Sequence, residues 1–252
     1  MLPNTPKIVD VLPGTVVHLW CHFCDGKEDY FPKLWFYKPR GDKKQAEILS
    51  DVENNDFSTK IVITPVHILN IYDFNENNSG IYSCRSPETM QKGNIFTYIL
   101  EGILSVEISP KVGTFNQWQE YNRNYLDTIN KKFIISEEEP FKSLRRDLNK
   151  TLKLTTIWEN WGECKEIGRQ KGVRKRLGRC HLQPSVVNST LEIKPLDVAS
   201  NTALSYFTDG YYIPCRSLQL NKTAPKISQI LRNIPDFEEE ETCNVIKRGR
   251  SK

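Results

Sequence analysis

The sequence predicts a mostly β protein in which a short helical bridge joins two β-rich regions that are held by disulfides. Apolar and polar residues alternate in several short runs, as they do in half-buried strands. Pro, Gly, Asn and Asp separate these runs and favour turns between them. Seven cysteines in 252 residues indicate an oxidising compartment, where disulfides form and persist. A chain of this length is expected to hold two domains.

The first β-rich region consists of six short runs. In residues 15–21 the period of two turns Val17, Leu19 and Cys21 inward. The sequence Pro39-Arg40-Gly41-Asp42 has turn chemistry and ends the run before it. The expected strands are residues 7–10, 15–21, 34–38, 57–63, 67–71 and 94–100, the last continuing to residue 108.

Cys21, Trp35 and the run Asn78-Ser79-Gly80-Ile81-Tyr82-Ser83-Cys84 resemble the core cysteines, tryptophan and tyrosine corner of V-type immunoglobulin superfamily domains. The resemblance covers roughly residues 7–108. It implies an Ig-like antiparallel β-sandwich in residues 1–108, a Cys21–Cys84 disulfide, and Trp35 and Tyr82 in the structural core. Asn78 stands where the family has Asp, so neutral hydrogen bonds should replace the usual charge pair.

A helical pattern follows the last expected strand. Apolar residues recur every three or four positions at Phe115, Trp118, Tyr121, Tyr125, Ile129 and Phe133, and then at Leu144, Leu148 and Leu152. We therefore place a helical bridge at residues 109–154. Its apolar stripe is expected to pack on the neighbouring sandwich rather than to meet a membrane or a partner helix.

A second motif follows the bridge. Trp158-Glu159-Asn160-Trp161-Gly162-Glu163-Cys164 and Gly172-Val173-Arg174-Lys175-Arg176-Leu177-Gly178-Arg179-Cys180 resemble a thrombospondin type 1 repeat. The resemblance implies that the guanidinium groups of Arg174 and Arg176 stack between the indoles of Trp158 and Trp161. We assign residues 155–235 to this β-rich region. An Ig-like domain followed by such a segment is similar to uncharacterised single-pass V-type Ig-like membrane proteins.

The cysteines of this region depart from the repeat pattern. The resemblance implies a Cys180–Cys215 disulfide, but the family's second cysteine is absent after Cys164. Cys164 then needs a distant partner such as Cys243, one of three connectivities that stay open. Cys24 is either an odd thiol or half of an interdomain bridge.

Seven positive charges lie in residues 165–179, namely Lys165, Arg169, Lys171, Arg174, Lys175, Arg176 and Arg179. Such a cluster could bind a sulfated glycan, although stacking on tryptophan or plain solvation also accounts for it. The net charge of +4 is no nucleic-acid signature. Residues 236–252 join an acidic run to a basic end and are expected to form a disordered charged tail.

Catalytic and metal chemistry find little support in the sequence. The four histidines stand in no nucleophile or acid–base spacing, and no Gly-rich phosphate loop is present. The cluster His18-x-x-Cys21-His22-x-Cys24 lacks the second cysteine pair that a zinc site needs. We therefore expect no enzyme activity, no cofactor and no metal.

The cysteines and four N-glycosylation sequons indicate the compartment of the protein. The candidate glycosylation sites are Asn77, Asn149, Asn188 and Asn221. The sequence contains no apolar run that could be a signal peptide or a membrane span. We expect an extracellular or cell-membrane ectodomain whose signal peptide and membrane helix are missing from this sequence.

These observations favour a non-enzymatic recognition or adhesion protein of the immunoglobulin superfamily that binds a protein ligand or receptor. Its recognition loops are expected at residues 24–33 and 87–94. The alternative is a secreted glycosaminoglycan-binding factor that uses the basic strands at residues 165–179.

Overall fold

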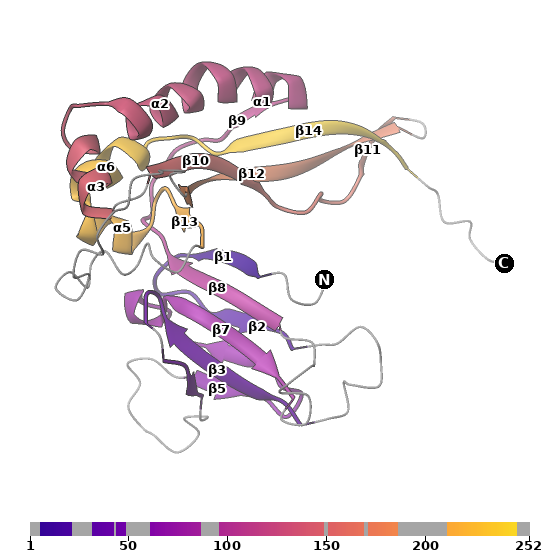
Figure 1. Ribbon diagram of the computed structural model, residues 1–252. Helices are drawn as coiled ribbons and strands as arrows, with labels where there is room; N and C mark the ends of the chain where they lie inside the picture. Colours follow the sequence, from indigo (N-terminus) through magenta and orange to yellow (C-terminus); the bar gives the residue numbers. More distant parts are fainter. Residues whose placement is uncertain are drawn as a thin grey trace. The chain divides into compact units, whose positions relative to one another are not determined.

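The chain forms two compact units in the computed structural model (Figure 1). The first unit consists of the described residues from the start of the chain to Ser105, together with Tyr211 and the segment Arg216–Pro225. The second unit consists of the other described residues. Both units are mostly β with a few short helices, as the sequence predicts. The structure describes residues 6–21, 32–42, 44–48, 61–86, 96–148, 151–168, 171–185 and 211–245.

The first unit is an Ig-like β-sandwich. One sheet has the strand order β1-β8-β7-β3-β4 and the other has the order β2-β6-β5. β1 and β8 run parallel, whereas the other neighbouring strands are antiparallel. The strands are β1 (Lys7–Val11), β2 (Val17–Leu19), β3 (Leu34–Pro39), β4 (Ala46–Glu47), β5 (Ile61–Ile63), β6 (Leu69–Ile71), β7 (Gly80–Arg85) and β8 (Phe96–Gly102).

The inward side chains of the two sheets meet in one core. Trp35 and Cys84 are fully buried, and a disulfide joins Cys84 to Cys21. The indole N–H of Trp35 donates to the carbonyl of His67 over 2.9 Å, which satisfies this buried polar group. Leu69, from the opposite sheet, belongs to the same core and is fully buried.

A tyrosine corner ties β7 to the turn before it. The hydroxyl of Tyr82 donates to the carbonyl of Asn78 over 2.8 Å, and burial raises the pKa of Tyr82 above its usual range. The side-chain oxygen of Asn78 accepts from the backbone N–H of Asn75 over 2.8 Å. The amide of Asn78 therefore closes this turn with neutral hydrogen bonds.

A segment from late in the chain completes the sandwich unit. Ile103 forms a β-bridge with Ser217, and the backbone N–H of Leu104 donates to the carbonyl of Arg216. Helix α5 (Leu218–Thr223) follows in the same unit. The boundary expected at residue 108 is thus corrected, because the unit ends at Ser105 and recruits residues that lie more than a hundred positions later.

The returning segment stabilises a buried charge on β8. Glu101 is 0% exposed, and Arg40 Nη1 lies 3.4 Å from Glu101 Oε2. The hydroxyl of Ser217 donates to Glu101 Oε1 over 2.8 Å and accepts from the backbone N–H of Leu220 over 3.0 Å. One hydroxyl therefore caps α5 and satisfies the carboxylate at the same time.

The second unit is built on a six-stranded sheet with the order β10-β12-β14-β9. The 15-residue strand β12 pairs with β10, β11, β13 and β14, all antiparallel. β9 pairs with β14 in parallel. The strands are β9 (Lys111–Gly113), β10 (Thr151–Trp158), β11 (Lys165–Gly168), β12 (Lys171–Ser185), β13 (Ile213–Pro214) and β14 (Phe237–Asn244).

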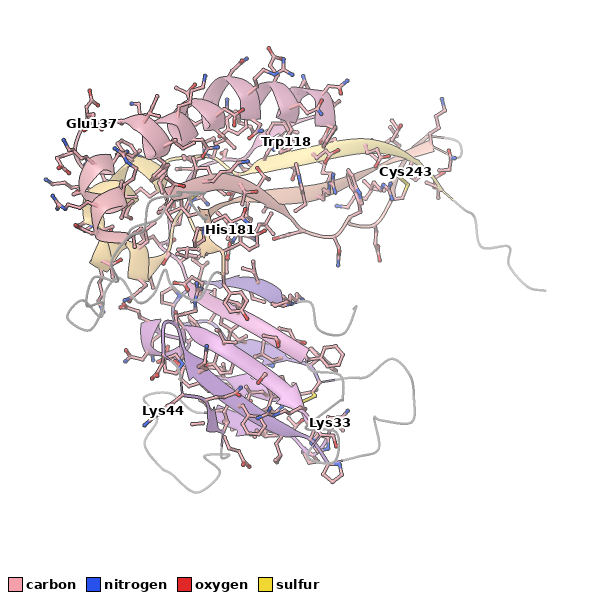
Figure 2. All side chains as sticks on the ribbon, in the orientation of Figure 1. Lys33, Lys44, Trp118, Glu137, His181 and Cys243 are labelled. Atoms are coloured by element: carbon pink, nitrogen blue, oxygen red, sulfur yellow. A yellow bond between two sulfur atoms is a disulfide. The ribbon has the colours of Figure 1, made fainter. Side chains whose placement is uncertain are left out.

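Helices pack on this sheet (Figure 2), whereas the sequence interpretation placed their apolar stripe on the sandwich. The indole N–H of Trp118 donates to Thr156 Oγ1 on β10 over 3.2 Å, and Phe133 is 1% exposed. The apolar face of β10, with Leu152 and Leu154 buried, provides the complementary surface. The helices are α1 (Phe115–Tyr121), a π-helical turn (Asn122–Leu126), α2 (Asp127–Ile135), α3 (Phe141–Leu148) and α6 (Pro225–Leu231).

The acidic run near the end of the chain is a strand. Residues 237–244, which the sequence interpretation assigned to a disordered tail, form β14 between β12 and β9. Disulfides join Cys164 to Cys243 and Cys180 to Cys215. The expectation of disorder was wrong because the carboxylates of this run pair with cations on β12. A prediction of disorder from local charge composition does not take such distant partners into account.

We predict that Ser217→Ala lowers the free energy of unfolding of the first unit by about 2 kcal/mol, since it removes a helix cap and a hydrogen bond to a buried carboxylate. Urea denaturation followed by circular dichroism measures the change. Ser105→Ala, at an exposed position, is the matched control and should have no effect. Equal stability of both variants would show that residue 217 does not support the sandwich.

Candidate functional site

The outward face of the three-stranded sheet exposes large apolar side chains. Val17 and Leu19 of β2 are buried, so alternation turns Val16, His18 and Trp20 to the outside. Trp20 is 52% exposed and Val16 is 46% exposed. Tyr72, just past β6, is 40% exposed. An exposed tryptophan and tyrosine on one sheet face are typical of a recognition surface.

A polar pair lies across the middle of this face. His18 and Asn70 are directly opposite each other on β2 and β6. His18 Nδ1 lies 2.6 Å from Asn70 Oδ1, so the ring donates to the amide oxygen. Asn70 is 8% exposed, which makes this pair a fixed polar point between Val16 and Trp20.

The five-stranded sheet differs, because large apolar side chains on its outward face are buried. Trp35, Tyr82 and Leu100 point into the core, so their neighbours along each strand point outward. Among these outward residues, Phe36 is 8% exposed, Ile81 is 5% exposed and Ile99 is 1% exposed. Among the described residues of the first unit, the exposed tryptophan and tyrosine, Trp20 and Tyr72, thus lie on the β2-β6-β5 face.

The recognition loops expected from the sequence fall mostly outside the described residues, and so does Cys24. Sequence reasoning overlooked Trp20. Its signal was the alternation itself, since a strand with Leu19 and Cys21 inward must turn position 20 outward.

Trp158, Trp161, Arg174 and Arg176 form one layered ladder in the second unit. The guanidinium carbon of Arg176 lies 4.5 Å from the ring centroids of both tryptophans. The guanidinium carbon of Arg174 lies 4.7 Å from the ring centroid of Trp161. The order in space is therefore Trp158, Arg176, Trp161, Arg174.

Carboxylates of β14 neutralise this ladder. Arg174 is opposite Glu241 in the sheet register and Arg176 is opposite Glu239. Arg174 Nη2 lies 2.9 Å from Glu241 Oε2, and Arg176 Nη2 lies 2.7 Å from Glu239 Oε2. Each guanidinium thus meets an indole face and a carboxylate, which gives it a structural role.

The opposite face of the same strands repeats the charge pairing. Lys175 Nζ lies 2.8 Å from Glu238 Oε1 and 2.6 Å from Glu240 Oε1. Hydrogen bonds to Glu238 and then Glu240 raise the pKa of Lys175 above its usual value. Arg179 Nε also pairs with Glu159 over 2.7 Å.

The basic ribbon expected from residues 165–179 is therefore largely compensated. Four of its cations are paired with carboxylates, whereas Lys165 and Lys171 are exposed on β11 and β12. Arg169 lies outside the described residues. The partners on β14 were missed because they lie 63 to 67 positions downstream of the cations they pair with.

The glycosylation candidates are placed differently. Asn77 is exposed in a 3-10 turn of the first unit. Asn221 is half-buried in α5. Asn149 and Asn188 lie outside the described residues.

The part of the chain that the structure describes contains neither a metal-binding cluster nor a membrane-spanning helix. There, no three His, Cys, Asp or Glu side chains are grouped to hold a metal ion. None of the helices in the same ranges has the length and apolar character that a bilayer crossing requires.

No protein-family model and no curated protein matches this sequence. Solved Ig-type structures overlap part of it. A mutant extracellular fragment of novel immune-type receptor 10 is 17% identical, with a TM-score of 0.29, and the overlap covers 40% of this chain and 98% of the fragment. The extracellular fragment of novel immune-type receptor 11 from Ictalurus punctatus is 14% identical, with a TM-score of 0.28, and the overlap covers 38% of this chain and 97% of the fragment.

The extracellular domain of the voltage-gated sodium channel beta4 subunit is 15% identical, covering 42% of this chain and 98% of its own, with a TM-score of 0.30. TM-scores this low say nothing about the function of this chain. The Ig-like fold of the first unit rests instead on its own sheets, disulfide and core.

We predict that Trp161→Ala lowers the free energy of unfolding of the second unit by about 2 to 3 kcal/mol, because it removes two cation–π contacts and part of a packed side chain. Lys175→Ala should change stability little, since Lys175 is exposed to solvent. Thermal denaturation of both variants measures the difference. Equally small changes would mean that the ladder does not hold the unit together.

Proposed function

We propose that this chain is a non-enzymatic recognition protein that binds a protein partner through the outward face of its three-stranded sheet. The observation that carries the proposal is the exposure of Trp20, Val16 and Tyr72 on one face of a disulfide-linked Ig-like sandwich. A few residues contribute most of the binding energy in protein interfaces, and tryptophan and tyrosine are enriched among them.

The chemistry of this face fits a protein better than a small molecule. The apolar residues flank the His18–Asn70 pair on a sheet surface, and such an arrangement of apolar anchors around a fixed polar point is typical of protein interfaces. Tryptophan and tyrosine lose little conformational entropy on binding for the area they bury. The polar pair would set the register of the partner.

The three disulfides support an extracellular or cell-surface location for this activity. The exposed sequon at Asn77 is compatible with glycosylation in the secretory route. We propose this compartment, and with it a role in adhesion or receptor binding. The Trp158-to-Arg174 ladder then acts as the thrombospondin-like core of the second unit and not as its binding site.

The glycan alternative is less well supported. A sulfated glycan requires cations that are free to pair with its anions, and Arg174, Lys175, Arg176 and Arg179 already pair with carboxylates. Among the described cations of the ribbon, this leaves Lys165 and Lys171, a sparse charge for glycan binding.

We predict that replacing Trp20 and Tyr72 by Ser weakens binding of the full chain to its protein partner by about a hundredfold, because each aromatic anchor contributes more than 1 kcal/mol. The partner is found by probing an array of cell-surface ectodomains with the labelled, multivalent chain, and the affinity is then measured by surface plasmon resonance.

Ile167→Ser, which removes an equally apolar side chain that is 70% exposed on β11, is the matched control. It should bind normally. Binding that survives loss of both aromatics, or that vanishes on raising the salt from 0.15 to about 0.5 M, would contradict the proposal and favour a charged surface.

A further inference from the structure

The two outer edges of the sheet in the second unit differ in how their backbone groups are satisfied. On β10 the side chain of Asn130 bonds both backbone groups of Leu154: Asn130 Oδ1 accepts from Leu154 N over 2.6 Å, and Nδ2 donates to its carbonyl over 3.3 Å. Asn130 is 6% exposed. A buried amide from α2 therefore occupies this edge as a partner strand would.

The edge of β14 is covered over its first half. β9 pairs with Phe237–Glu239, and the chain then turns into α1. The backbone N–H of Lys111 donates to the carbonyl of Asp236 over 2.9 Å, which shows that even-numbered backbone groups of β14 point to this side. By alternation, Thr242 and Asn244 also direct their N–H and C=O groups to this edge. No described strand pairs with them there.

A groove of 660 Å³ lies at this open stretch. Its walls come from the start of α1, from the Trp–Arg ladder and from β14, and they include Phe115, Trp161, Glu241 and Thr242. Phe115 is 43% exposed. An extended peptide that paired with Thr242 would direct alternate side chains into this groove.

The charge beside the edge selects the kind of peptide. The groove is lined by the carboxylates of Glu239, Glu240 and Glu241 and by only two guanidinium groups, those of Arg174 and Arg176, so the groove keeps an excess negative charge. Lys171 is opposite Asn244 at the end of the strand pair. Both hydrogen bonds from Arg174 go to Oε2 of Glu241. A second copy of this strand would bring like charges together across the new pair, which is unfavourable. A basic segment would be attracted.

We propose that the open edge of β14 binds an extended, basic segment of a partner protein by β-strand addition beside Thr242 and Asn244. Main-chain hydrogen bonds provide the affinity, and the acidic groove selects lysine or arginine side chains at alternate positions. This site lies wholly in the second unit and does not depend on the function proposed for the sandwich.

The first test uses hydrogen–deuterium exchange of the full chain with a capped ten-residue peptide of alternating lysine and valine. The amides of Thr242 and Asn244 should exchange rapidly in the free protein and slow on peptide addition. The amides of Glu241 and Cys243, which face β12, are internal references and should be protected throughout. A matched peptide with glutamate in place of lysine should bind at least about tenfold more weakly.

The second test separates backbone pairing from side-chain contact. Thr242→Pro removes an N–H that points away from β12, and proline is tolerated on a strand edge. It should weaken peptide binding about tenfold or more, whereas Thr242→Val, which keeps the N–H, should bind like the original chain. If Thr242→Pro fails to fold, a peptide with N-methyl groups on alternate backbone nitrogens tests the same hydrogen bonds on the unaltered chain.

Three results would overturn the proposal. Protection of Thr242 and Asn244 before any peptide is added would show that the edge is already occupied, and concentration-dependent protection would identify a second copy as the occupant. Unchanged exchange at saturating peptide would exclude strand addition. Equal affinity for the acidic peptide would exclude selection of a basic segment.

Discussion

Both units of this protein depend on the constraint that a buried charge must be paired. Glu101 is fully buried on β8, and its carboxylate is held by Arg40 and by Ser217 from the end of the chain. Glu239 is 5% exposed, and it pairs with Arg176. Leaving either carboxylate alone would cost several kcal/mol. Each pair therefore joins parts of the chain that are far apart in the sequence.

This constraint explains how the units are built. The sandwich is completed by Ser217 and α5 because they satisfy the carboxylate on β8. The acidic run of β14 becomes an interior strand because its register places three of its four glutamates, Glu239, Glu240 and Glu241, opposite a cation. The same pairing uses up charges that a surface site would need. Electrostatics in these strands thus contribute to structure, and recognition falls to apolar surfaces and strand edges.

The two candidate surfaces differ in chemistry. On the sandwich, Trp20 and Tyr72 form a side-chain surface around one polar pair. In the second unit, Thr242 and Asn244 provide backbone groups beside a groove. The first surface would select a partner by shape and apolar area, and the second by extended conformation and charge.

The sequence alone determined what depends on local pattern. Period-two alternation gave the strands around Leu19 and Trp35, and a spacing of three to four gave the helices between Phe115 and Leu148. The same spacing was wrong for Leu152, which lies in strand β10. The same alternation determines that Trp20 points outward, because its neighbour Leu19 points inward. The Cys and Trp motifs suggested an Ig-like sandwich because they repeat a known local arrangement.

Tertiary structure alone decided which distant segments pair. The sequence interpretation placed the helices on the wrong sheet and treated the acidic run as a tail. The sheet on which a helix packs and the strand with which a segment pairs are not determined by neighbours along the chain. Asn130 reaches β10, Glu241 reaches Arg174 and Ser217 reaches Glu101 across 24, 67 and 116 positions. Such contacts are set by the free energy of burying and pairing groups in three dimensions, which composition and periodicity do not encode.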